Sequence, residues 1–462
     1  MAVNIEHLAW QLRQFQENAD RPAIIASDRT ATYADLTLLY EQAVQTLADA
    51  GVEPGECVGV ISDYSPAAVA CLLALIKFKC ILVPLSHASR DQHSEFFKIA
   101  ELDRLVEISV HGKVQVQSLP HRQNHPLLAQ LRATKESGLI LFSSGSSGKP
   151  KAILHSLPNL LKKFRTPRHC YRTLSFLLFD HIGGFNTLFY TLANGGCVVV
   201  PNDRSVAAVC DAIERHRVEL LPSTPSFFNL LLLADAPRSY DLSSLKLITY
   251  GTEVMSERTL AMVNAAFPHA RFQQTYGLTE LGILRSKSAS NGSLMVKIGG
   301  EDYETKVVDG ILFVRAKSSM LGYLNAPSPF DEEGWFDTND MVIQDGEYYR
   351  ILGRHSDLIT VGGQKVYPAE VEEVISGIDG VVDVSVGGEE HLIMGQLVVA
   401  TLQMEEPVSA LKMRRIVTAH CKNRLQPFMI PMKVRVVTGP LLNYRFKKIR
   451  RLDGASHAAT KE

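Results

Sequence analysis

A loop rich in serine and glycine separates two apolar runs in the first third of the chain. Leu139 to Phe142 form the first run, and the loop that follows reads Ser143-Ser144-Gly145-Ser146-Ser147-Gly148-Lys149-Pro150-Lys151. Glycines let backbone N–H groups approach an anion closely, hydroxyls add neutral donors, and the two lysines add positive charge. The loop therefore predicts a binding site for a polyphosphate.

Two other interpretations of this loop are a Walker P-loop and a flexible linker. A Walker P-loop has four residues between its glycines and a Gly-Lys-Ser/Thr ending. Here two residues separate Gly145 from Gly148, and Pro150 follows Lys149, which disfavours a Walker nucleoside triphosphatase. A Gly/Ser linker remains an alternative for this stretch taken alone, but the strand-like run from residue 152 to 155 follows the loop directly.

Further along the chain, polar residues stand at the ends of apolar runs. The segments are Gly251-Thr252-Glu253, Tyr276-Gly277-Leu278-Thr279-Glu280, Gly334-Trp335-Phe336-Asp337-Thr338-Asn339-Asp340, Gly353-Arg354 and Lys447-Lys448-Ile449-Arg450. Each has a structural interpretation when it is taken alone, as a strand-to-helix connection, a turn cap or a solvated basic tail. Their order along the chain carries more information than any one of them.

In this order the segments resemble the motifs of the adenylate-forming superfamily, which includes acyl-CoA synthetases, adenylation domains of nonribosomal peptide synthetases and firefly luciferases. The resemblance extends over nearly the whole chain. Two departures stand out: Asn339 and Lys447 each occupy a position where the family has glycine. Asparagine tolerates positive φ better than most residues, so the first departure is mild.

The resemblance implies an ATP site. The residues it assigns to the nucleotide are Ser143, Ser144, Gly145, Ser146, Ser147, Gly148, Lys149, Lys151, Gly251, Thr252, Glu253, Tyr276, Gly277, Asp340 and Arg354. In the family the tyrosine stacks on adenine, the aspartate accepts hydrogen bonds from the ribose hydroxyls and the arginine contacts the ribose.

The resemblance also implies catalytic residues. Thr279 would meet a phosphate and Glu280 would hold Mg²⁺, a hard dication that prefers carboxylate and phosphate oxygens together. The family's catalytic lysine near the C-terminus matches Lys448, with Lys447 as the alternative. His181 would form part of the wall of the acyl site and would respond to substrate binding.

The acyl substrate would contact a small set of residues by the same resemblance: His181, Ile182, Gly183, Tyr250, Gly251 and Leu278. Members that activate α-amino acids place an aspartate after the aromatic position, where this chain has Ile182. A plain carboxylic acid is therefore favoured, although Asp180, one residue before His181, keeps the α-amino acid alternative open.

Beyond Gly353-Arg354 the pattern becomes a small α+β unit. The expected elements are a hairpin at 361–366, helices at 368–376 and 410–424, and strands at 381–386 and 397–402. The resemblance implies that this unit is mobile, with Ser356 at the hinge where the family has aspartate or lysine. Gly363 would line the tunnel for a thiol arm.

The remaining pattern predicts the fold class. Short β-rich runs alternate with helical runs between residues 21 and 221, which indicates a mostly parallel α/β sheet. We expect a large N-terminal α/β domain, residues 1–353, and a small mobile α+β domain, residues 354–462. At 462 residues the chain is too long for one ordinary core.

Composition excludes several classes of protein. The net charge of -1 gives no reason to expect nucleic-acid binding. Charged residues in the first twenty positions argue against a secretory signal, and Lys77 and Lys79 interrupt the most apolar run, so no membrane span is expected. Seven cysteines without a C-x-x-C pair are typical of a reduced, cytoplasmic protein.

The function implied by the resemblance is ATP-dependent activation of a small carboxylic acid to an acyl-adenylate, followed by thioester formation with coenzyme A. One alternative acceptor is the phosphopantetheine of an acyl or peptidyl carrier protein, with a fatty or aryl acid as substrate. A more distant alternative is a non-catalytic adenylate-binding protein, but such a protein would not be expected to keep Glu280 and Lys448.

Overall fold

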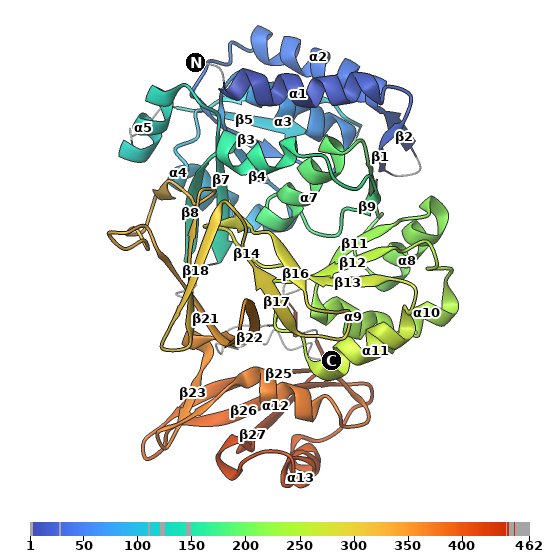
Figure 1. Cartoon of the computed structure of the whole chain (residues 1–462), viewed down its shortest axis with the longest axis vertical. Coiled ribbons are helices and arrows are strands. Elements are labelled where there is room, and N and C mark those ends of the chain that lie inside the picture. The colour runs from blue at the N-terminus through green and yellow to red at the C-terminus, as the bar shows by residue number, and fades with distance from the viewer. Residues whose placement is uncertain are drawn as a thin grey trace, which may run out of the picture.

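The computed structural model describes residues 3–26, 29–109, 111–120, 125–144, 149–439, 441–442 and 448. In Figure 1 the segment after residue 358, coloured orange and red, forms a layer below the rest of the chain. The part above it contains two large β-sheets with helices around them and a third sheet between these and the lower layer.

The first sheet has the strand order β13-β12-β11-β9-β10-β1-β2 and is parallel except for its edge strand β2. Its strands are β1 (Pro22–Ala26), β2 (Arg29–Thr32), β9 (Arg172–Leu174), β10 (Cys197–Val200), β11 (Leu220–Ser223), β12 (Leu247–Tyr250) and β13 (Arg271–Gln274). One face is covered by α8 (Val206–His216), α9 (Pro225–Leu233), α10 (Ala236–Ser239) and α11 (Glu257–Ala266).

The second sheet has the order β20-β8-β7-β4-β3-β5-β6, with a parallel centre and antiparallel edges. Its strands are β3 (Cys57–Ile61), β4 (Ile81–Leu85), β5 (Arg104–Ile108), β6 (Val114–Ser118), β7 (Gly138–Ser144), β8 (Pro150–Ser156) and β20 (Gly322–Tyr323). Strands β3 and β4 are buried at every position, because helices cover both faces.

One hydrophobic core lies between these two sheets and includes residues of five helices. They are α1 (Val3–Glu17), α2 (Tyr33–Asp49), α3 (Pro66–Lys77), α6 (Leu157–Leu161) and α7 (Ile182–Ala193). The outer face of the second sheet packs on α4 (His93–Ile99), which η1 (His87–Gln92) precedes, and on α5 (Pro126–Thr134).

Helix starts follow their capping residues. Thr32 and Asp35 form a reciprocal capping box at α2. Ser65 caps α3 and Thr224 caps α9, each followed by a proline at the first helical position. These local signals place the helix starts next to the strand ends that carry the polar segments.

A third sheet, entirely antiparallel, joins the upper part to the C-terminal unit. Its order is β16-β17-β22-β21-β19-β18. Its strands are β16 (Ser286–Ser288), β17 (Met295–Ile298), β18 (Tyr303–Val308), β19 (Ile311–Ala316), β21 (Phe336–Asp345) and β22 (Tyr348–Arg354); the short pair β14 (Gly277–Leu278) and β15 (Gly282–Ile283) precedes it.

The C-terminal unit has its own sheet and core. Its elements are β23 (Ile359–Val361), β24 (Gln364–Val366), α12 (Pro368–Ile375), β25 (Val381–His391), β26 (Gly395–Met404), α13 (Ala410–Cys421), η4 (Pro427–Met429) and β27 (Lys433–Val437). The 3₁₀ turn η3 (His355–Asp357) connects it to β22. We propose the domain boundary at 353/354, where β22 ends.

Candidate functional site

A single cavity of about 1360 Å³ brings together most of the residues that the sequence singled out. The ones on its wall are Ser143, Lys151, His181, Ile182, Gly183, Gly251, Thr252, Glu253, Tyr276, Gly277, Leu278, Thr279, Glu280, Asp340, Arg354, Ser356 and Lys448. They span the chain from the second sheet to its last described residue. The cavity is therefore formed where both large sheets, the antiparallel sheet and the C-terminal unit meet.

The strands on either side of the serine-rich loop are paired, and Ser143 lies opposite Lys151 in the β7–β8 register. Four loop residues, Gly145, Ser146, Ser147 and Gly148, lie outside the described residues, as does the side chain of Ser144. Lys149, at the end of the loop, is exposed.

Lys151 and Glu280 meet at one tyrosine. The Lys151 ammonium lies 4.8 Å from the centroid of the Tyr323 ring, and the Tyr323 hydroxyl donates a hydrogen bond of 2.8 Å to Glu280 Oε1. One face of this tyrosine thus attracts the cation while its hydroxyl fixes the carboxylate. Tyr323 thus holds Lys151 and Glu280, which are far apart in the sequence, on the same wall of the cavity.

Tyr276 and Asp340 form the second polar pair. The Tyr276 hydroxyl donates to Asp340 Oδ2 at 2.7 Å, and Arg354 Nε lies 3.4 Å from Asp340 Oδ1. Asp340 and Arg354 are also directly opposite in the β21–β22 register. Burial raises the pKa of Asp340, and the nearby Arg354 opposes that effect. The aspartate is thus oriented from two sides.

We expect Tyr276→Phe to raise the KM for ATP by about 10-fold or more, because a hydrogen bond to a buried carboxylate is worth roughly 1.5–3 kcal/mol. Asp340 would lose the donor that orients it. Tyr349→Phe is the matched control, since it removes a buried tyrosine hydroxyl that bonds Thr305 in the same sheet. Equal effects of the two variants on the KM for ATP would contradict the assignment.

Two backbone positions at the cavity adopt positive φ without being glycine. Asn339 has φ 59°, as expected for an asparagine in place of the family's glycine. Thr252 has φ 71°, a conformation that costs a β-branched residue roughly 1–3 kcal/mol. The strain falls in the turn Gly251-Thr252-Glu253, on the cavity wall.

Close packing explains two glycines at the site. A Cβ on Gly251 would lie 2.7 Å from the backbone oxygen of Thr275. A Cβ on Gly277 would lie 2.6 Å from the backbone oxygen of Gly282. Neither position has room for a side chain, so the turns that carry Thr252 and Thr279 approach their neighbours directly.

His181 caps α7 at one end of the cavity. Its Nδ1 accepts a hydrogen bond of 3.1 Å from the N–H of Gly183, and both residues line the cavity. Ile182 and Leu278 are buried on the same wall. Tyr250, in contrast, packs in the core beside Phe228 and is not on the wall of the described cavity.

Asp180 is bound by Ser86 and does not line the described cavity. Its Oδ2 accepts hydrogen bonds from the hydroxyl of Ser86 at 2.6 Å and from the N–H of Ser86 at 3.2 Å. Asp180 is buried and does not belong to the wall of the described cavity. The geometry therefore offers no support for Asp180 as the partner of an α-ammonium group.

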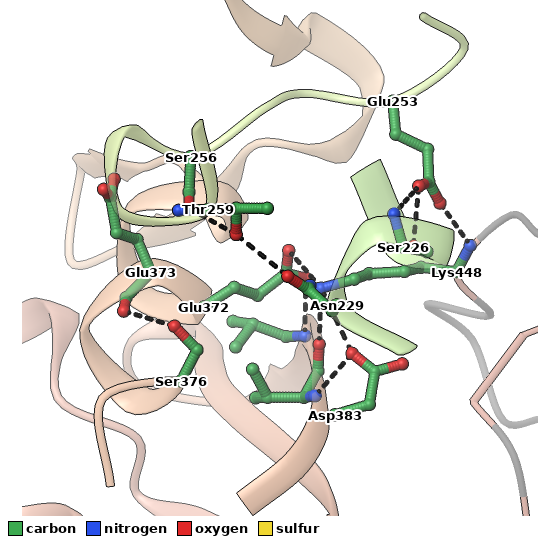
Figure 2. A network of polar contacts seen from close by, with 12 residues as sticks. Ser226, Asn229, Glu253, Ser256, Thr259, Glu372, Glu373, Ser376, Asp383 and Lys448 are labelled. Carbon is green, nitrogen blue, oxygen red and sulfur yellow. Dashed lines mark hydrogen bonds and ion pairs between the residues drawn. The ribbon is translucent and has the colours of Figure 1, made fainter. Parts of the chain in front are cut away.

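Lys448 lines the described cavity, and Figure 2 shows its side chain extending toward Glu372 and Asp383 of the C-terminal unit. Its backbone N–H donates to Glu253 Oε1 at 3.0 Å, while its ammonium lies 2.8 Å from the carbonyl of Val384, 3.4 Å from Glu372 and 3.5 Å from Asp383. The backbone is docked on the large domain and the side chain leans back on its own domain. Lys447 lies outside the described residues.

Other residues of this network were not singled out by the sequence. The hydroxyl of Ser226, at the start of α9, donates to Glu253 Oε2 at 2.6 Å. Burial raises the pKa values of Glu253 and Asp383, and Lys448 opposes both shifts. Of these residues, Ser226 is the one that belongs to a recognisable sequence pattern, the helix start Ser223-Thr224-Pro225-Ser226.

The C-terminal unit docks on α11 through a second contact. Glu373 of α12 accepts a hydrogen bond of 3.0 Å from the N–H of Glu257, the first residue of α11. A carboxylate at a helix N-terminus is stabilised by the free N–H groups there. Together with Lys448, this contact holds the unit over one side of the cavity.

Ser356 and Gly363 occupy different places. Ser356 is in η3, directly after β22, and lines the cavity. Gly363 is in the β23–β24 turn, has φ 84°, and a Cβ there would meet nothing within 4 Å. Gly363 is not part of the wall of the described cavity in this conformation.

Comparison with known proteins identifies the family. The family model of AMP-binding enzymes matches residues 12–324, and that of the AMP-binding enzyme C-terminal domain matches residues 370–443. The chain therefore belongs to the AMP-binding enzyme family, as the resemblance of its motifs predicted. The two matched segments lie on either side of the proposed domain boundary.

Similar proteins include CoA ligases. The chain is 26% identical over 438 residues to indoleacetate–CoA ligase of Aromatoleum aromaticum, a match that covers 83% of this chain and 85% of the relative. It is 27% identical over 470 residues to 2-succinylbenzoate–CoA ligase of Bacillus subtilis, which covers 93% of both chains.

A solved structure gives the same fold. The o-succinylbenzoate CoA synthetase of Bacillus subtilis, in complex with an acyl-adenylate intermediate, superposes with a TM-score of 0.77 at 24% identity and covers 96% of each chain. This likeness confirms the fold class: a large α/β part with a separate C-terminal domain. Among the described residues, no helix is long and apolar enough to cross a membrane.

Proposed function

We propose that this protein is an ATP-dependent acyl-CoA ligase that activates a small carboxylic acid as its adenylate and transfers the acyl group to a thiol. The observation that carries the proposal is the convergence of the phosphate-loop strands, the 276–280 segment, the Asp340–Arg354 pair and Lys448 on one cavity. The names of the relatives support it, because both curated relatives above are CoA ligases.

The chemistry needs no side-chain nucleophile. A carboxylate oxygen of the substrate attacks the α-phosphorus of ATP and pyrophosphate leaves, which gives the acyl-adenylate. A thiolate then attacks the acyl carbon and AMP leaves with one of the original carboxylate oxygens. The protein contributes by positioning the reactants and by neutralising charge.

The geometry supports the proposed nucleotide contacts. Asp340, held by Tyr276 and Arg354, faces the cavity with an oriented carboxylate suited to two ribose hydroxyls. The turn at Gly251 and the ring of Tyr276 would flank the adenine. Thr279 and the serine-rich loop would contact phosphate.

Glu280 is the proposed Mg²⁺ residue. Within the described part of the chain, no group of three or more His, Cys, Asp or Glu side chains is placed to hold a metal ion. A single carboxylate oriented by Tyr323 fits Mg²⁺, which commonly binds through one or two carboxylates plus substrate phosphates and keeps several waters. When bound, Mg²⁺ would neutralise charge on the phosphates of ATP.

We propose that the C-terminal domain alternates between two positions about Ser356. In the present position Lys448 reaches the cavity, whereas Gly363 lies outside its described wall. This arrangement suits adenylate formation. Thiol capture would require a rotation that brings Gly363 to the thiol entrance.

Coenzyme A is the proposed acceptor, and a phosphopantetheinyl carrier protein is the alternative. Basic side chains are concentrated in the C-terminal domain: Arg414, Arg415, Lys422, Arg424, Lys433 and Arg435. Two of them, Lys433 and Arg435, are already paired with Glu389. The charge suits either the nucleotide end of coenzyme A or an acidic carrier.

Gly363→Leu should slow thioester formation by on the order of 10-fold or more while pyrophosphate exchange continues, because the new side chain would obstruct the thiol arm. Positive φ makes the substitution strained in any case. Gly346→Leu is the matched control, since Gly346 has φ 57° and also has nothing within 4 Å of its Cβ. If both variants slow the thiol step equally, backbone strain explains the effect and the tunnel assignment is wrong.

The proposed function is tested by ATP–pyrophosphate exchange with a panel of fatty, aryl and α-amino acids, without any thiol. We expect exchange with some plain carboxylic acids and poor exchange with α-amino acids, because Ile182 stands where the ammonium partner would be and Asp180 is bound by Ser86 off the described cavity wall. Repeating the assay with coenzyme A and with a carrier protein identifies the acceptor. Absence of exchange and of AMP across the whole panel, on folded protein, would refute the ligase function.

A further inference from the structure

The cavity continues along α7 beyond the proposed acyl carboxyl position. The residues of α7 on its wall recur at helical spacing and share one face: Ile182, Gly183, Asn186, Thr187 and Tyr190. Tyr190 is nine positions after His181, which caps the helix, so the two lie about 13.5 Å apart along the helix at 1.5 Å per residue. The far end of this extension lies outside every motif that the family resemblance assigned.

Lys163, in the 3₁₀ turn η2 (Lys162–Arg165), belongs to this far end. Its ammonium donates to the carbonyl of Ile283 at 2.8 Å and lies 5.2 Å from the Phe164 ring centroid. Phe164 in turn packs edge-on against Tyr190, with 6.5 Å between ring centroids. Lys163 is therefore placed at the Tyr190 end of the cavity.

The ammonium of Lys163 has no acidic partner within the described part of the chain. An ammonium has three donors, and one neutral carbonyl accepts from it here. Burial and the positive charge of Arg285 lower the pKa of Lys163 to about 7. A half-buried ammonium near another positive charge is costly unless an anion accompanies it.

Basic side chains line the surrounding wall as well. Besides Lys163 it contains Arg168, His169, Arg271, Arg285 and Lys287. The positive charges of Arg168 and Arg271 act on the Tyr190 hydroxyl. The acidic residues on the described cavity wall come instead from segments 253–280, 337–357 and 370–373.

A polar group on the ligand would also meet Asn186. This residue lines the cavity between His181 and Tyr190, and its Oδ1 is buried without a hydrogen-bond partner. Asparagine side chains present an acceptor on one side and donors on the other. A wholly apolar acyl chain would leave Asn186 Oδ1 without a donor and the Lys163 ammonium with the Ile283 carbonyl alone.

We propose that the acyl substrate carries a second negatively charged group, and that Lys163 binds this group by a salt bridge at the far end of the cavity. The inference rests on the proposed ligase function and specifies its substrate as a dicarboxylic acid, or an acid with an equivalent second anion. The two charged groups would lie roughly 8–14 Å apart. The lower value is the rise along α7 from His181 to Asn186, and the upper value is the rise from His181 to Tyr190, at 1.5 Å per residue.

The test uses pairs of aliphatic and aryl dicarboxylic acids with their monomethyl esters, in which a neutral ester replaces the second carboxylate. We expect pyrophosphate exchange to show a kcat/KM for the best diacid about 10- to 100-fold above that of its monoester, the range for one charge-assisted hydrogen bond. The difference should lie mainly in KM, because the contact is remote from the reacting carboxyl.

Lys163→Met should bring this diacid-to-monoester ratio close to one, and Lys163→Arg should retain part of it. Lys162→Met is the matched control, because Lys162 is the exposed neighbour on the same turn and lies off the described cavity wall; it should keep the original ratio. If Lys163→Met melts below the assay temperature, Lys163→Gln replaces it. The diacid-to-monoester ratio of the unaltered protein still decides whether the second anion is recognised.

Three outcomes are distinguishable. Exchange with monoesters as efficient as with diacids across the panel would overturn the anionic subsite while leaving the ligase function intact. A diacid preference that survives in both Lys163→Met and Lys163→Gln would show that Lys163 does not bind the second anion. No exchange with any acid would refute the ligase function itself.

Discussion

Lys448→Ala should reduce adenylate formation by on the order of 10²–10³, the usual loss for one preorganised charge donor. Its backbone N–H donates to Glu253 at the cavity wall, and Lys448 itself lines the cavity in which we propose that ATP binds. To act there the ammonium must leave Glu372 and Asp383. Transfer from supplied acyl-adenylate should be largely kept if, as we propose, that step uses a second position of the C-terminal domain.

The measurement is pyrophosphate exchange beside a separate assay of thiol transfer from synthetic acyl-adenylate. Lys433→Ala is the matched control, a lysine of the same domain that pairs with Glu389 away from the described cavity wall. Equal loss in both half-reactions would contradict domain alternation. If Lys447→Ala is the one variant that loses adenylation, the mechanism stands and the catalytic lysine is Lys447 instead of Lys448.

Glu280→Gln should lower adenylate formation by on the order of 10²-fold, because the amide keeps the shape but removes the charge that would hold Mg²⁺. The fold should be unchanged, since an amide oxygen can still accept the hydrogen bond from Tyr323. The Mg²⁺ concentration needed for half-maximal exchange should rise as well. This second readout separates a metal-binding role from a structural one.

Glu347→Gln provides the control for Glu280→Gln. Glu347 forms an ion pair with Lys297 at 2.6 Å in the antiparallel sheet, outside the described wall of the cavity. It should leave both the rate and the Mg²⁺ dependence unchanged. An unaltered Mg²⁺ requirement in Glu280→Gln would mean that the metal is held elsewhere.

Much of the fold was predictable because its local signals agree. The alternation of strands and helices between residues 21 and 221 and the hairpin at 361–366 are as expected, and Thr224-Pro225 begins α9 with a capping hydroxyl and an early proline. The antiparallel sheet of β16 to β22 was harder to predict from the sequence. Its strands pair across distances in the chain that periodicity alone does not specify.

The motifs predicted which residues meet, but not how they are held. Tyr276, Glu280 and Asp340 share the cavity wall as their order in the chain suggested. The partners that orient them, such as Tyr323 on the carboxylate of Glu280, come from strands with no motif of their own. Tyr250 differs from expectation because its ring fills the core and only the following turn reaches the cavity.

Lys163 shows the limit of sequence reasoning most clearly. A lysine in a helical turn after β8 would ordinarily be interpreted as solvated, and Lys162 beside it is exposed. Its placement depends on the packing of η2 against α7 and on the carbonyl of Ile283, which lies 120 residues away in the chain. Such a contact becomes visible only when the tertiary structure is known.

The most direct test of the acyl-adenylate chemistry follows the oxygen atoms. The protein is incubated with Mg²⁺-ATP, coenzyme A and a carboxylic acid labelled with ¹⁸O in both oxygens, and the products are analysed by mass spectrometry. Adenylate formation predicts one ¹⁸O atom in the AMP and none in the pyrophosphate. Label in pyrophosphate or inorganic phosphate, or thioester formed with unlabelled AMP, would contradict activation at the α-phosphate.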